Sequence, residues 1–224
     1  MTKIATFMAG DGAASRIAYY ATRAAVAGFT RAWTRLRVEG VEHLPVSGAY
    51  VLAPVHRSYM DTPLVSCLTR RRLRFMGKDS LWKRRPLAWL FSSLGGFPVS
   101  RGTADREALK RCILILRAGE PLVLFPEGER KSGPVVQPLF DGAAYVALKT
   151  GVPIVPVGIG GSERVLPKGA RFIYPRKVHI IVGQPIVTSP SAVGRVPRAA
   201  IHEVTATLHA TLQQLFEQAQ RRVG

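Results

Sequence analysis

The spacing of apolar and polar residues changes repeatedly along the chain, which predicts a succession of helices and strands. From Ser15 to about Leu36 the spacing is helical, with steps of about 100° per residue. One face of this helix carries Arg16, Arg23, Arg31 and Arg37, and the opposite side carries Ala18, Ala25, Phe29, Trp33 and Leu36. We therefore predict an amphipathic helix that either packs on the domain or lies among lipid headgroups.

The following segments alternate between strand-like and helix-like patterns. In order they are LRVEGV, AYVLAPV, TPLVSCLTR, LRFMG, LWKRRPLAWLF, GFPVS, ADREALKRCILILRA and PLVLFP. Such alternation indicates an α/β fold with a mixed, mostly parallel sheet flanked by helices. The runs AYVLAPV, PLVLFP and VPIVPVGI have little polar alternation, which predicts strands covered on both faces.

The C-terminal part of the chain adds three expected elements. RFIYP and KVHIIVG are expected to form a hairpin at the far side of the sheet, and Arg198 to Arg222 reads as a closing helix. We predict two parts, a membrane-surface helix over residues 1–37 and a single α/β domain over residues 38–224.

Composition indicates a folded domain with an anionic partner. The 224 residues are 47% hydrophobic and carry a formal net charge of +18. Nucleic acid and an anionic membrane both attract clustered Lys and Arg, so charge alone leaves both open. Cys67 and Cys112 lie in apolar surroundings, which predicts buried thiols and fits a reducing cytoplasm.

The sequence shows neither a signal-peptide pattern at its start nor a run of 18 nearly uninterrupted apolar residues. If the protein meets a membrane, we expect it to lie on the surface.

The first segment with chemical content is VLAPVHRSYMDTPLV, in which His56 follows a buried strand and Asp61 comes five residues later. The carboxyl ends of strands are where α/β sheets usually place their sites. Five residues correspond to about 140° on a straight helix, so contact between the two side chains requires a turn. If they meet, Asp61 orients His56 as a general base for an external hydroxyl. As a purely structural residue, Asp61 would instead cap the following helix.

Two further segments carry polar residues just after strands. LVLFPEGERKSG places Glu127, Gly128 and Arg130 in a turn, and LGGFPVSRG places Arg101 between glycines, where its guanidinium can fork onto a phosphate. Taken singly, each is also ordinary turn or surface chemistry.

Four ordered blocks, His56-x4-Asp61, GGFPVSR, FPEGER and VPIVPV, together resemble the lysophosphatidic acid acyltransferase family over about residues 36 to 190. The resemblance implies acyl transfer from acyl-CoA or acyl-carrier protein to a lysophospholipid hydroxyl, without a metal, a cofactor or an acyl-enzyme intermediate. With lysophosphatidic acid as acceptor, the product is phosphatidic acid for phospholipid synthesis.

The same resemblance assigns roles to individual residues. His56 is expected to be the general base and Asp61 its orienting partner. Phe97 and Arg101 match the second block, whose arginine is expected to hold the acceptor phosphate. Glu127, Gly128 and Arg130 match the third block, associated with the phosphorylated glycerol. Backbone N–H groups after Val55 or near Gly128 are candidates to stabilise the tetrahedral oxyanion.

The third block departs from the family's usual Phe-Pro-Glu-Gly-Thr-Arg-Ser, because Glu129 and Lys131 replace its threonine and serine. A second carboxylate beside a phosphate site is repulsive unless it pairs with Lys131 or points away. This leaves open another lysophospholipid or an amino-lipid as acceptor.

Membrane contact is the interpretation we favour for the positive charge. RRRLRFMGKDSLWKRRPLAWLFSSLGG alternates basic clusters with Trp82, Trp89, Leu90 and Phe91, as an interfacial segment does. Arg70 to Arg74 with Phe75 could instead track a nucleic acid, but no nucleic-acid-binding signature accompanies them. The remaining histidines lack metal-ligand spacing. We therefore expect a peripheral protein on the cytoplasmic face of the cell membrane, without nucleic acid or metal.

Overall fold

The computed structural model describes residues 12–99, 106–167, 169–189 and 196–224. Its helices are α1 (Ala13–Thr34), η1 (Val41–His43), α2 (Asp61–Ser66), η2 (Asp79–Trp82), α3 (Arg85–Ser93), α4 (Arg106–Arg117), α5 (Gly142–Thr150), α6 (Ser162–Val165) and α7 (Arg198–Val223). Its strands are β1 (Arg37–Glu39), β2 (Val51–Pro54), β3 (Arg74–Lys78), β4 (Gly96–Val99), β5 (Leu122–Val123), β6 (Ile154–Gly160) and β7 (His179–Val182).

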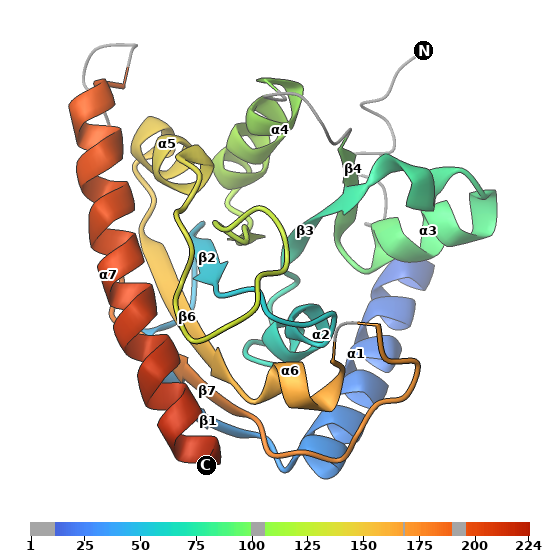
Figure 1. Cartoon of the computed structure of the whole chain (residues 1–224). Coiled ribbons are helices and arrows are strands. Elements are labelled where there is room, and N and C mark those ends of the chain that lie inside the picture. The colour runs from blue at the N-terminus through green and yellow to red at the C-terminus, as the bar shows by residue number, and fades with distance from the viewer. Residues whose placement is uncertain (1–11, 100–105, 168, 190–195) are drawn as a thin grey trace.

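The seven strands form one sheet in the order β1-β7-β6-β2-β5-β3-β4 (Figure 1). All neighbouring pairs are parallel except β6 and β7, so the sheet is mixed and mostly parallel, as predicted. Every residue of β2, β6 and β7 is buried, because helices cover the sheet on both sides. Helices α4, α5 and α7 lie on one side, and α1, α2 and α3 lie on the other.

The expected hairpin of RFIYP with KVHIIVG is wrong. Residues 171–178 form no strand, and β7 instead pairs antiparallel with β6, from Val157 opposite Val182 to Gly160 opposite His179. One edge of the fully buried β6 pairs with β2 and the opposite edge pairs with β7. Phe172 and Tyr174 are exposed and contact each other in a loop. Both cysteines are buried thiols that form no disulfide, as predicted.

Helix α1 docks on the domain through a face other than the one its hydrophobic pattern suggests. Its buried residues are Ser15, Tyr19, Ala27, Thr30 and Thr34. The Arg23 guanidinium also turns inward and donates to the carbonyls of Thr69 and Cys67. Hydrogen bonds therefore fix this contact, and Phe29, on the predicted apolar side, stays exposed.

The packing of α7 on the sheet depends on two glycines. A Cβ at Gly158 would lie 2.4 Å from the backbone of Leu215, and one at Gly160 would lie 2.4 Å from the backbone of Ala219. Because glycine has no side chain, α7 can lie directly on β6 at these two positions. This contact brings Phe216 toward the strand ends, where the site lies.

Candidate functional site

Two loops that leave neighbouring strands form the site. Strands β2 and β5 are parallel and adjacent, with Val51 opposite Leu122 and Leu52 opposite Val123. The loops that follow them, residues 55–60 and 124–141, therefore emerge at the same edge of the sheet. Residues about 70 positions apart in sequence meet there, and the Lys131 N–H donates to the His56 carbonyl at 2.9 Å.

His56 and Asp61 make the contact that the turn between them was predicted to allow. The distance from Nδ1 of His56 to Oδ2 of Asp61 is 2.9 Å. Asp61 is completely buried, whereas the His56 side chain is 16% exposed. A carboxylate at Nδ1 holds the proton there, which leaves Nε2 as the ring nitrogen with a lone pair for an incoming proton.

The Asp61 carboxylate also organises the turn that carries His56. Its Oδ2 accepts hydrogen bonds from the N–H groups of Arg57 at 2.6 Å and Ser58 at 2.7 Å. Asp61 is the first residue of α2 and Met60 is its cap, so Asp61 does not cap this helix. The carboxylate instead faces back into the turn and fixes both the imidazole and the backbone that presents it.

Phe125 supports the imidazole from the neighbouring loop. The two rings stack with centroids 4.0 Å apart and planes 25° from parallel. This contact limits rotation of His56 about its side-chain bonds, so the direction of Nε2 is set by a ring face and by a carboxylate together.

Glu127 lies beneath the site and is completely buried. Its carboxylate accepts hydrogen bonds from the His56 N–H at 3.0 Å, from Nη1 of Arg57 at 2.8 Å and from the Gln137 N–H at 3.1 Å. All of these donors belong to the protein. The geometry gives Glu127 the position of a clamp between the two loops, rather than of a group facing an acceptor.

Arg57 was not singled out by the sequence, since no spacing rule marks the residue after a histidine. Its side chain is 2% exposed, pairs with Glu127 and lies over the ring of Phe216 at 4.7 Å. The buried Arg57–Glu127 ion pair joins the His56 loop, the 124–141 loop and α7 in one assembly.

Gly128 adopts a φ of +72°, and a Cβ there would lie 2.6 Å from the ring of Phe140. Both facts explain the glycine, because a side chain would be strained and would collide. Two residues on, the Arg130 guanidinium lies 3.4 Å from the centroid of the exposed Tyr59 ring. Among the described residues Arg130 has no carboxylate partner, which leaves its charge available to an anion.

The unusual Glu129 and Lys131 pair with each other, with 2.7 Å between Nζ and the carboxylate. This is one of the two arrangements under which a second carboxylate does not oppose a phosphate at Arg130. The added negative charge is balanced locally.

Only part of the second block, GGFPVSR, lies within the described residues. Phe97 is in β4 and lies buried in the core, at 1% exposure. Arg101 lies outside the described residues.

Several of the backbone donors expected to stabilise an oxyanion are occupied by the protein. The N–H groups of His56, Arg57 and Ser58 donate to Glu127 and Asp61, and that of Gly128 donates to the Phe125 carbonyl. That expectation is therefore wrong for these four groups. In place of binding an oxyanion, they hold the two loops in shape.

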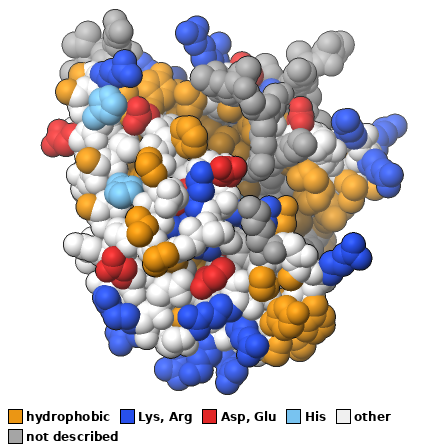
Figure 2. Space-filling model, viewed as in Figure 1, with side chains coloured by type: hydrophobic (Ala, Val, Ile, Leu, Met, Phe, Trp, Pro, Cys, Tyr) orange, Lys and Arg blue, Asp and Glu red, His pale blue; other side chains and the backbone are white. Residues whose placement is uncertain are grey.

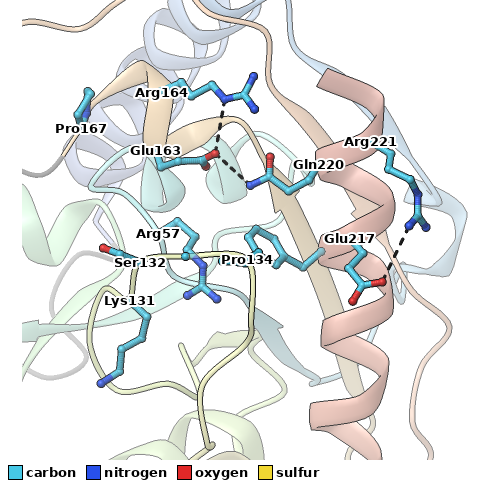
Figure 3. A pocket seen from close by; sticks show the side chains of 12 residues that line it. Arg57, Lys131, Ser132, Pro134, Glu163, Arg164, Pro167, Glu217, Gln220 and Arg221 are labelled. Atoms are coloured by element: carbon cyan, nitrogen blue, oxygen red, sulfur yellow. Dashed lines mark hydrogen bonds and ion pairs between the residues drawn. The ribbon is translucent and has the colours of Figure 1, made fainter. Parts of the chain in front are cut away.

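Two cavities lie near the His56–Asp61 turn, and His56 itself lines neither of them. One, of about 640 Å³, lies beside Arg57 and Lys131 and extends to α6 and α7 (Figure 3). The other, of about 240 Å³, has an apolar lining and lies beside Thr62 and Pro63, between α1, α2 and α3. Charged side chains line the first cavity beside Arg57, whereas the surface of the second is apolar.

An imidazole oriented by a buried carboxylate is an arrangement that many enzymes use to take a proton from a hydroxyl. Comparison with known proteins is more specific. A family profile described as Acyltransferase matches residues 35–160, and the chain belongs to this family. The match includes His56, Asp61 and the whole FPEGER block.

Two relatives are acyltransferases by name. The chain is 30% identical over 156 residues to a chloroplastic 1-acyl-sn-glycerol-3-phosphate acyltransferase of Brassica napus, covering 68% of this chain and 45% of that protein. It is 26% identical over 152 residues to the enzyme of that name from Bacillus subtilis, covering 67% and 73%.

The fold has a solved counterpart in the 1-acyl-sn-glycerophosphate acyltransferase PlsC from Thermotoga maritima. The TM-score is 0.72 at 26% identity, over 88% of this chain and 78% of that one. The chain spans less than half the length of the chloroplast relatives that it matches.

Proposed function

We propose that the protein transfers a fatty acyl group from acyl-CoA or acyl-carrier protein to the free hydroxyl of lysophosphatidic acid, giving phosphatidic acid. The observation that carries this proposal is the 2.9 Å contact between Nδ1 of His56 and Asp61, which leaves Nε2 as a base on a partly exposed ring. Membership of the Acyltransferase family and the names of the relatives support the reaction class.

In the proposed reaction, Nε2 of His56 accepts the proton of the acceptor hydroxyl while its oxygen attacks the thioester carbonyl. Asp61 stabilises the imidazolium that forms. The tetrahedral intermediate then breaks its C–S bond, and the departing sulfur takes the proton from His56 and leaves as a thiol. The products are an ester and a free thiol, and no bond to the protein forms.

Arg130 supports a phosphate-bearing acceptor, because its guanidinium lies at the surface over Tyr59 and has no carboxylate partner among the described residues. A planar guanidinium can donate two parallel hydrogen bonds to a phosphate. By its position in sequence, Arg101 is proposed as a second phosphate ligand. The apolar groove beside Thr62 and Pro63 is the proposed place of the acyl chain.

The protein is further proposed to work as a peripheral protein on the cytoplasmic face of the cell membrane. Exposed apolar side chains on α1 and α3 include Ile17, Tyr20, Leu87 and Trp89, and the exposed Lys83, Arg84 and Arg85 lie beside them. Figure 2 shows apolar side chains gathered over α3 next to basic ones. In the described part of the chain, no helix is long and apolar enough to cross a bilayer.

Thiol release from palmitoyl-CoA tests the proposal, measured with lysophosphatidic acid, with lysophosphatidylcholine and without acceptor. Release that depends on lysophosphatidic acid is expected, and His56→Ala should lower it by about 10²–10⁴-fold, the usual contribution of a general base. His202→Ala, which changes an exposed histidine of α7, is the matched control.

Release supported equally by the choline lipid would move the acceptor to another lysophospholipid. An absence of acceptor-dependent release with both CoA and carrier-protein thioesters would remove the acyltransferase proposal.

A further inference from the structure

The larger cavity lies at the same edge of the sheet as His56 and is built from three elements. Its walls are the segment after Lys131, the short helix α6 and the C-terminal half of α7 (Figure 3). Strand β6 is parallel to β2 and adjacent to it, so the turn after β6 carries α6 to the strand ends next to the His56 loop. Two residues of that site, Arg57 and Lys131, line the cavity.

The charged side chains around this cavity are mostly cationic. They are Arg57, Lys131, Arg164 and Arg221, against Glu163 and Glu217. Arg57 is held in the buried pair with Glu127 and forms part of the wall. The other three cations come from three different elements, and Figure 3 shows them on separate sides of the opening.

Two of these cations are weakly engaged. Arg164 is 3.9 Å from its neighbour Glu163, and Arg221 is 3.9 Å from Glu217. Both distances are long for an ion pair, and the arginines are 50% and 70% exposed. Replacing these contacts with contacts to a ligand therefore costs little free energy. Arg164 also donates to the carbonyl of Gly224. A ligand with several phosphates offers these guanidinium groups stronger, charge-assisted hydrogen bonds.

We infer that this cavity binds the phosphate-bearing nucleotide part of coenzyme A, so that a CoA thioester lies with its sulfur at His56 and its acyl chain in the apolar groove. The assignment rests on the proposed acyl transfer. It places the nucleotide beside the cationic side chains of the cavity that Arg57 lines, and the acyl chain in the apolar cavity that Thr62 and Pro63 line.

Size and position favour the donor over the headgroup of the acceptor lipid. A volume of about 640 Å³ suits a ligand much larger than a glycerol phosphate. Figure 1 shows α7 and the exposed apolar helix α3 on opposite sides of the molecule. An acceptor lipid anchored in a membrane near α3 stays on that side, whereas a water-soluble nucleotide reaches the α7 side from solvent.

Calorimetric titration of the full chain with CoA tests this inference without requiring turnover. Arg164→Glu and Arg221→Glu should each weaken CoA binding by about tenfold, which is about 1.4 kcal/mol. The control is Arg117→Glu, an exposed arginine at the end of α4 that makes the same change in net charge away from the cavity. All the changed residues are exposed, and thermal unfolding verifies that each variant is folded.

Three further probes separate the sources of phosphate: 3′-dephospho-CoA, glycerol 3-phosphate and inorganic phosphate. We expect affinity to fall from CoA to 3′-dephospho-CoA, and we expect the other two to compete only weakly. The inference is overturned if CoA binds the cavity variants as tightly as the wild type, or if Arg117→Glu weakens binding equally. It is also overturned if glycerol 3-phosphate, rather than CoA, shows the dependence on Arg164.

Failure of this inference is distinguishable from failure of the proposed function. CoA binding that depends on Arg164 and Arg221, without transfer to any lysolipid, would support the cavity assignment and contradict the reaction. Transfer from a carrier-protein thioester by a chain that does not bind CoA would support the reaction and contradict the assignment.

Discussion

The substitution Glu127→Gln tests whether this residue holds the site together or contacts the acceptor. The change keeps size and shape and removes one negative charge. Because the side chains of Glu127 and Arg57 are 0% and 2% exposed, the guanidinium would remain buried without its counter-charge. Breaking one partner out of such a pair costs about 3–5 kcal/mol.

The hydrogen bonds of Glu127 also predict that Glu127→Gln lowers the stability of the fold. One carboxylate oxygen accepts from the His56 N–H and the other from the Gln137 N–H, and both contact Arg57. A glutamine presents an NH₂ group on one side, so either orientation leaves one backbone donor facing another donor. The cost is a large part of the stability of about 5–15 kcal/mol that is typical of a domain.

Urea unfolding followed by circular dichroism measures the loss, with Glu203→Gln on the exposed face of α7 as control. We also expect the double variant Arg57→Met, Glu127→Leu to be more stable than Glu127→Gln, since no buried charge remains unpaired. In kinetics, a positioning role predicts that Glu127→Gln lowers kcat more than it raises KM for the lysolipid. Wild-type stability together with a raised acceptor KM would refute the clamp and return Glu127 to the acceptor site.

Three other predictions concern packing, pH and the membrane. Gly158→Ala should destabilise the fold by about 1–3 kcal/mol because its Cβ meets the backbone of α7, whereas Gly28→Ala, with open space around it, should not; chemical denaturation compares them. Burial raises the pKa of Tyr50 above its ordinary 10.0. Since the unfolded chain loses this proton first, its contribution to stability is complete below pH 10 and is lost as pH rises through the folded pKa; Tyr50→Phe should flatten that decline in unfolding measured from pH 9 to 11. Trp89→Ser should reduce flotation with anionic vesicles, and equal flotation of this variant and the wild type would contradict the α3 surface.

The fold class could be predicted because β2 and β6 are continuous apolar runs, and only strands covered on both faces need such a composition. Strand pairing could not. The segment RFIYP has a strand-like composition, yet the edge available to β7 belongs to β6, which is distant in sequence. The docking face of α1 was missed for a similar reason, since the half-buried Arg23 and the buried Thr30 face the domain through hydrogen bonds that a hydrophobic pattern does not count.

In the site, the contact of His56 with Asp61 was expected from the family resemblance, and the spacing added that the chain must turn between them. The position of Glu127 did not follow from its motif, because its partners are a backbone N–H of the neighbouring loop and the side chain of Arg57. Arg57 itself becomes recognisable only when the parallel pairing of β2 with β5 brings the loops together. Motifs could locate the groups proposed to face a substrate, whereas the positions of the groups beneath them depend on tertiary packing.

Helix α7 lies outside the region that the family profile matches, yet it supports the site. The matched region ends at residue 160, whereas Phe216 lies under Arg57, and Gln213 and His209 bond to the two backbone groups of Val136. Grafting residues 35–160 onto another scaffold would therefore carry the motifs without the surface on which their loops rest. In this chain, the segment needed to hold the site in shape is therefore longer than the segment that matches the family.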